Sequence, residues 1–142
     1  MIYLDSSSPL KLFHDEPESA GVRRAVAAES DVIVSTLAQV EALVHFKAGW
    51  LGGDYGKARY QAYVERFEAL GEIVPFRFAG LSGSVFLTAI RQDWSAGSHH
   101  VRVLDRLHLA AMEELKVRRL MTNDANQATA ARALGWVVVT PG

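Results

Sequence analysis

The sequence predicts a three-layer α/β/α domain in which helices cover both faces of a central, mainly parallel sheet. Short apolar runs alternate with amphipathic, helix-like segments along the whole 142-residue chain. This alternation favours parallel strands joined by right-handed crossovers. No repeat, low-complexity tract or long linker interrupts the pattern, and 49% of the residues are hydrophobic. Residues 1–142 are therefore expected to form a single domain.

The expected strands are short apolar runs bounded by turn-forming or polar residues. They cover residues 1–4, 32–34, 72–76, 119–122 and 136–140. The first ends at Asp5, where small polar residues and Pro9 favour a turn that leads into a helix. The third is the weakest, because Pro75 lacks an amide hydrogen and favours an edge position.

The expected helices follow from apolar periodicity and from residues that begin or end helices. They cover residues 19–29, 35 or 36 to about 49, 54 to about 70, 82–91, 101–116 and 124–134. Ser35 or Thr36 can cap the second helix, Asp54 can cap the third, and Gly135 ends the last. Residues 95–100 are expected to form a polar loop.

The composition excludes several kinds of chemistry. The chain has no cysteine, so disulfides, thiolate catalysis and zinc-thiolate sites are absent and any metal must be held by oxygen or imidazole ligands. The net charge of −1 gives no general attraction to nucleic acid. No apolar segment is long enough for a membrane span, and the first residues do not resemble a signal peptide. We therefore expect a soluble, cytoplasmic protein.

Two acids are expected at the carboxyl edge of the sheet, where α/β proteins place their ligand sites. Asp5 closes the first strand, and Asp124 follows the strand at 119–122 almost at once. Each has a structural alternative of about equal weight, since Asp is also a common N-cap and turn residue. Neither acid is decisive by itself.

Two further acids interrupt apolar helix faces. Glu41 shares a face with Leu37, Val44 and Ala48, and Asp105 lies among Val101, Leu109 and Met112, so both are expected to point towards the core.

A buried carboxylate requires a cation or several hydrogen-bond donors. The structural alternative is a salt bridge to Arg102 or Arg106. Four acids on one edge would form an oxygen-only site that suits Mg²⁺ and could support hydrolysis of a phosphodiester.

The chain resembles the PIN-domain family, particularly VapC-type toxins of toxin–antitoxin pairs, in four segments that follow the family's order. These are MIYLDSSSPLKLF, STLAQVEAL, VLDRLHLAA and MTNDANQATAARALGWVVV. The resemblance places the family's acids at Asp5, Glu41, Asp105 and Asp124. It also implies that the hydroxyls of Ser6 and Thr122 orient the acidic site. Arg106 departs from the small residue that the family often has there, and it could contact substrate phosphate or pair with Asp105.

The resemblance implies RNA cleavage that depends on Mg²⁺, with Mn²⁺ as a substitute, inhibition of translation, a cognate antitoxin and a homodimer. Asp5, Asp105 and Asp124 are expected to hold the metal, and Glu41 to hold waters around it or a second ion. The alternative is a non-catalytic PIN-like protein-binding module whose acids are structural salt-bridge partners. The sequence does not identify the RNA, the cleaved sequence or the number of metal ions.

Overall fold

Five parallel strands form the central sheet of the computed structural model, which describes residues 1–142. They are β1 (Ile2–Leu4), β2 (Val32–Ser35), β3 (Phe76–Ala79), β4 (Arg119–Met121) and β5 (Val137–Val139). Their spatial order is β3-β2-β1-β4-β5. Strand β1 is therefore central: β2 and β3 are added on one side of it, and β4 and β5 on the other. In open α/β sheets a ligand site lies beyond the carboxyl ends of the strands at such a reversal.

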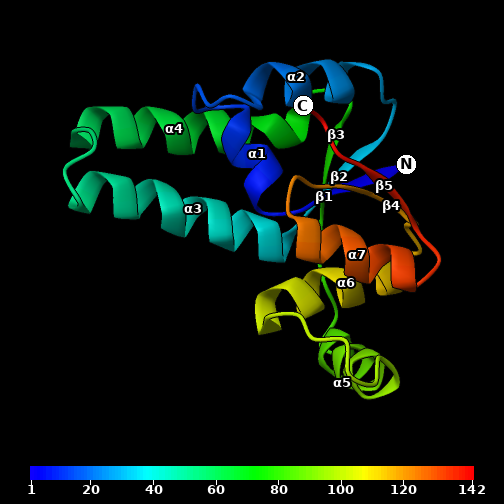
Figure 1. Cartoon of the computed structure of the whole chain (residues 1–142). Coiled ribbons are helices and arrows are strands. Elements are labelled where there is room, and N and C mark those ends of the chain that lie inside the picture. The colour runs from blue at the N-terminus through cyan, green and yellow to red at the C-terminus, as the bar shows by residue number, and fades with distance from the viewer.

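Seven α-helices cover the two faces of this sheet. They are α1 (Ser7–Lys11), α2 (Ser19–Ala27), α3 (Thr36–Leu51), α4 (Lys57–Ala69), α5 (Val85–Ser95), α6 (Val103–Leu115) and α7 (Ala125–Ala133). Figure 1 shows α5, α6 and α7 on one side of the sheet and α1 to α4 on the other, which confirms the predicted three-layer α/β/α architecture. No helix combines the length and the apolar character that a membrane crossing requires.

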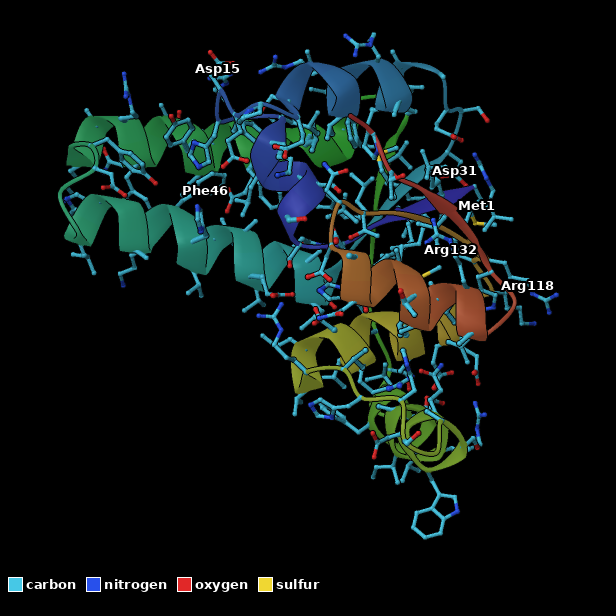
Figure 2. All side chains as sticks on the ribbon, viewed as in Figure 1. Met1, Asp15, Asp31, Phe46, Arg118 and Arg132 are labelled. Atoms are coloured by element: carbon cyan, nitrogen blue, oxygen red, sulfur yellow. The ribbon has the colours of Figure 1, made fainter.

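The strands separate two hydrophobic cores because successive side chains point to opposite faces. Tyr3 and Ile33 pack with α5, α6 and α7, whereas Leu4 and Val34 pack with the helices of the other layer. Phe46 is fully buried in this second core, between α3 and α4 (Figure 2). Packing in the two cores holds the helices in place against the sheet. Several of these helices begin at the carboxyl edge of the sheet.

Several predicted boundaries are wrong by a few residues. The third strand is Phe76–Ala79 rather than 72–76, because Pro75 cannot donate a ladder hydrogen bond and a 3₁₀ turn occupies Leu70–Glu72. Its predicted edge position is confirmed. Helix α4 begins at Lys57 with Gly56 at the N-cap, so Asp54 is not its cap. Helix α5 also begins and ends later than the predicted 82–91.

Candidate active site

Asp5 follows the central strand β1 and is almost completely enclosed, with 5% of its surface exposed. Its Oδ1 accepts hydrogen bonds from Ser7 Oγ at 3.0 Å and from Ser8 N and Oγ at 3.1 and 3.0 Å. Ser6 makes no such bond, and the expectation that its hydroxyl orients the acidic site stays a prediction. The register of the chain turns the hydroxyls of the next two serines towards the carboxylate.

Thr122 connects Asp5 with the end of β4. Its hydroxyl donates to Asp5 Oδ2 and accepts a hydrogen bond from the backbone amide of Asp124 at 3.0 Å. The predicted contact of Thr122 with the acids is therefore present. Asp124 is also the N-cap of α7, because its Oδ1 accepts from Gln127 N at 2.9 Å. Asp124 therefore caps α7 with Oδ1, as the structural alternative predicted, and its Oδ2 remains free to face the other acids.

Arg102 joins Asp124 to Asp105. Its Nε lies 3.1 Å from Asp105 Oδ2, and its Nη2 lies 3.7 Å from Asp124 Oδ2. The hydrogen bond to Asp105 raises the pKa of Arg102, and the charges of Asp105, Asp124 and Glu41 raise it further. One guanidinium therefore lies within the field of three of the four predicted acids. Since 77% of the Arg102 side chain is exposed, water screens these interactions and each is weak.

Glu41 reaches the same region from α3. The prediction of which face of α3 is buried is wrong. Val44 and Ala48 are exposed, and the buried residues of α3 are Ala38, Ala42 and Phe46. Glu41 lies beside this buried face and remains partly exposed. Its Oε1 is 2.5 Å from His108 Nε2. Asp105 is likewise only partly buried, so neither helical acid is embedded in the core as predicted.

A chain of polar side chains runs inwards from Glu41 through His108, which was not among the residues predicted for the site. His108 and Tyr3 are buried, and His108 Nδ1 lies 2.6 Å from the Tyr3 hydroxyl. Burial raises the pKa of Tyr3 above its usual value, and the charges of Asp5 and Glu41 add to this rise while a hydrogen bond with Ser35 opposes it. The signal in the sequence was the position of His108 one helical turn after Asp105.

Arg106 does not join the acids. Its guanidinium is largely buried and donates from Nη1 to Gln92 Oε1 at 3.3 Å, so the hypothesis that it pairs with Asp105 is wrong. Burial lowers the pKa of Arg106, and the charge of Asp93 opposes this effect. On a helix, successive side chains point in different directions, and Arg106 therefore points towards α5. A contact of Arg106 with RNA stays a prediction.

The acids suit a hard divalent ion by their chemistry, since all their donor atoms are carboxylate oxygens. The guanidinium of Arg102 lies beside Asp105 and Asp124. No three His, Asp or Glu side chains are arranged to hold one ion together. Magnesium often uses only one or two protein carboxylates and reaches others through water. The chemistry of Asp105 and Asp124, whose Oδ2 atoms both face the guanidinium of Arg102, therefore fits such an ion.

Two known ribonucleases are similar to this chain in sequence. Ribonuclease VapC46 of Mycobacterium tuberculosis strain ATCC 25618 / H37Rv is 31% identical over 149 residues, which cover 99% of this chain and 97% of the relative. Ribonuclease VapC47 of strain CDC 1551 / Oshkosh is 29% identical over 148 residues, which cover 100% and 98%. Both similarities extend over nearly the whole chain.

Solved structures share the fold at low sequence identity. The crystal structure of Mycobacterium tuberculosis VapC20, a sarcin-ricin loop cleaving toxin, has a TM-score of 0.73 and 16% identity and covers 99% of this chain and 100% of its own. A toxin–antitoxin complex from Klebsiella pneumoniae contains a chain with a TM-score of 0.68 and 15% identity, covering 100% of this chain and 98% of its own. The model of the PIN domain family matches residues 2–133. This chain therefore belongs to the PIN-domain family.

Proposed function

We propose that this protein is a metal-dependent endoribonuclease and the toxin of a toxin–antitoxin pair, with Asp5, Glu41, Asp105 and Asp124 as its acidic active site. The observation that carries the proposal is the hydrogen-bonded link from Asp5 through Thr122 to Asp124, which joins two of the acids where the neighbouring strands β1 and β4 end. Full-length similarity to two ribonucleases supports the reaction class.

Asp105 and Asp124 would hold Mg²⁺ or Mn²⁺, and Asp5 would complete the site from the interior. When bound, the ion would activate water and stabilise the negative charge that develops on the phosphate. The chain itself would orient the oxygens: serine and threonine hydroxyls fix Asp5, and the α7 cap fixes Asp124. Hydrolysis would form a bond from the water oxygen to phosphorus and break the bond to the leaving ribose oxygen, which receives a proton.

The test is incubation of the purified protein, free of any antitoxin, with total RNA in the presence of Mg²⁺ and with a chelator, followed by mapping of the cleaved ends. Asp5→Asn should fold but lose cleavage. Asp15→Asn is the matched control, because Asp15 is an exposed aspartate in the loop after α1 and accepts no side-chain hydrogen bond (Figure 2). Equal cleavage by wild type and Asp5→Asn would remove Asp5 from the site.

An antitoxin partner is the second part of the proposal. It is supported by family membership and by the fold shared with a chain of a toxin–antitoxin complex. Expression of the protein should arrest bacterial growth and inhibit translation, and expression of Asp5→Asn should not. Co-expression with the product of a neighbouring small open reading frame should restore growth and yield a complex without ribonuclease activity. Growth arrest by both forms would contradict a toxic ribonuclease.

A homodimer is the third part, and we assign it to the apolar surface formed by α3, α5 and α6. Eight apolar side chains on these helices are exposed: Val40, Val44, Phe86, Leu87, Ile90, Trp94, Val103 and Leu104. Two grooves of about 490 and 250 Å³ run across this surface and share Phe86 and Leu107. Val40, Phe86, Ile90 and Val103 line these grooves. Exposed apolar surfaces are common at interfaces between subunits.

Light scattering should give a dimer mass for the wild type and a monomer mass for Ile90→Asp. Val74→Asp is the control, since Val74 is exposed but lies outside this surface. A monomeric wild type would contradict the homodimer and leave the ribonuclease proposal intact.

The non-catalytic alternative is favoured by one observation, the pairing of Arg102 with Asp105 and Asp124. A protein-binding module of this kind would take up no magnesium. Calorimetric titration with Mg²⁺ separates the two functions, because the nuclease requires uptake that is lost in Asp105→Asn. Absence of uptake in the wild type would favour the binding module.

A further inference from the structure

Four polar side chains form a continuous hydrogen-bonded chain beside the acids. Glu41 Oε1 lies 2.5 Å from His108 Nε2. The other ring nitrogen, His108 Nδ1, lies 2.6 Å from the Tyr3 hydroxyl, and this hydroxyl lies 2.7 Å from Ser35 Oγ. The chain thereby joins α3, α6, β1 and β2.

The interior part of this chain is inaccessible to water. Tyr3, Ser35 and His108 are all buried, whereas Glu41 is partly exposed and reaches the solvent. A buried polar group is destabilising unless it has a hydrogen-bond partner, so each of the three holds the next in one orientation. The ring of Tyr3 also packs edge-on against the imidazole, with centroids 5.6 Å apart. Glu41 is thus the solvent-facing end of a rigid assembly.

The hydrogen-bond partners select one direction for the donors. Ser35 Oγ accepts from Ala38 N at 3.2 Å, as the cap of α3, so its own hydrogen is available for the Tyr3 oxygen. Tyr3 then donates to His108 Nδ1, and the remaining imidazole hydrogen is on Nε2, where it donates to Glu41. The reverse direction would leave the Ser35 hydroxyl hydrogen without an acceptor. Burial raises the pKa of Tyr3, which keeps the phenol protonated as this direction requires.

We infer that Tyr3 and His108 are positioning residues that fix one oxygen of Glu41 and leave the other for the active site. The effect on RNA cleavage rests on the proposed function. The hydrogen-bonded chain is observed independently of that function. The second oxygen of Glu41 makes no hydrogen bond within the protein, and the charge of Glu41 acts on Arg102 together with those of Asp105 and Asp124. Hydrogen-bond partners behind a reacting carboxylate commonly change metal affinity or activity by about 10- to 100-fold.

Tyr3→Phe tests the inference because it removes only the hydroxyl and keeps the ring. We expect kcat for RNA cleavage to fall roughly 10-fold or more, with KM within about twofold, and Mn²⁺ affinity measured by calorimetry to weaken several-fold. Tyr55→Phe is the matched control, since the Tyr55 hydroxyl donates to Phe46 O at 2.7 Å far from the acids. That variant should lose some thermal stability and keep its kcat and Mn²⁺ affinity.

Two further measurements separate positioning from a purely structural role. Nitrogen-edited NMR of the imidazole should find the hydrogen of His108 on Nε2, with a downfield proton resonance that moves in Tyr3→Phe and Glu41→Gln. His108→Gln, which retains a side-chain donor, should recover part of the activity that His108→Leu loses.

The inference is overturned if Tyr3→Phe lowers only the melting temperature, or if the hydrogen is found on Nδ1. If the wild type cleaves no RNA while Tyr3→Phe still weakens Mn²⁺ binding and shifts the NMR resonance, the proposed function fails and the positioning role stands.

Discussion

The interior and the rim of the acidic site hold their carboxylates in different ways. Asp5 is buried and receives four hydrogen bonds from groups of fixed geometry, namely two serines and Thr122. Asp105 and Asp124 direct an oxygen each to the exposed side chain of Arg102. Rigid, uncharged donors can stabilise a carboxylate permanently, whereas a solvated arginine can be exchanged for another cation at little cost. The comparison suggests that the interior of the site is preorganised and that the rim is exchangeable.

The largest expected effect comes from removing the interior acid. Asp5→Ala leaves Ser8 N and Thr122 Oγ1 without their acceptor, whereas Ser8 Oγ still has Met121 O at 3.2 Å, so we expect the free energy of unfolding to fall by about 3 kcal/mol. Asp105→Ala should change it by less than about 0.5 kcal/mol, since its arginine partner is solvated. Urea denaturation measures both. Equal losses of stability in the two variants would break the distinction between interior and rim.

Asp124 can be divided into its two roles. Asp124→Asn should keep the cap of α7 and the stability, because Asn is as good an N-cap as Asp, yet lose most RNA cleavage. Asp124→Ala should lose cleavage and about 1 kcal/mol of stability as well. Thermal melts together with the cleavage assay distinguish the roles. Retention of cleavage by Asp124→Asn would show that capping is the whole function of this residue.

A smaller effect is expected from Arg102, the exchangeable cation of the rim. Arg102→Met should increase the affinity for Mg²⁺ on the order of threefold, because the acids lose a competing positive charge. It should also raise KM for RNA if the guanidinium contacts phosphate once the ion is bound. Arg118→Met is the control. Arg118 is exposed directly before β4, at the amino end of that strand, whereas the acids lie at the carboxyl edge of the sheet (Figure 2). Unchanged calorimetric affinity would indicate that Arg102 does not compete with the metal.

The smallest effect is expected at Glu29, a carboxylate outside the acidic site that is paired with Arg119. Hydrogen bonds from Arg119, at 2.7 and 2.8 Å, lower the pKa of Glu29 below its usual value of 4.5. A depressed folded pKa contributes stability above the unfolded pKa, and this contribution disappears as pH falls through the folded value. Glu29→Gln should therefore lose about 1 kcal/mol or less near neutral pH.

The difference between the Glu29→Gln variant and the wild type should shrink below the unfolded pKa of 4.5. Urea denaturation at neutral and at acidic pH measures it, and RNA cleavage at neutral pH should be unchanged. A difference that is the same at both pH values would exclude Glu29 as the titrating group.

Much of the fold was predictable because its signals are local. The buried strands β1 and β2 and the alanine-rich helix α7 were expected within a few residues, since each combines an apolar pattern with a residue that ends it. The faces of α3 were not predictable. Val44 is as hydrophobic as a core residue but is exposed, while Ala42 is buried, because the approach of α4 and the sheet, which involves distant segments, decides which side of a helix is covered.

The sequence by itself determined the alternating α/β architecture, the edge of the sheet that carries the acids, and the oxygen-only chemistry available there. Only the tertiary structure decided which groups complete the site: Ser7 and Ser8 rather than Ser6 beside Asp5, Arg102 rather than Arg106 beside Asp105, and His108 behind Glu41. The periodicity of a helix or strand shows only which side chains share a face of that element. Hydrogen bonds depend on fractions of an ångström between elements that are far apart in the chain, and these distances exist only after the sheet and helices have packed.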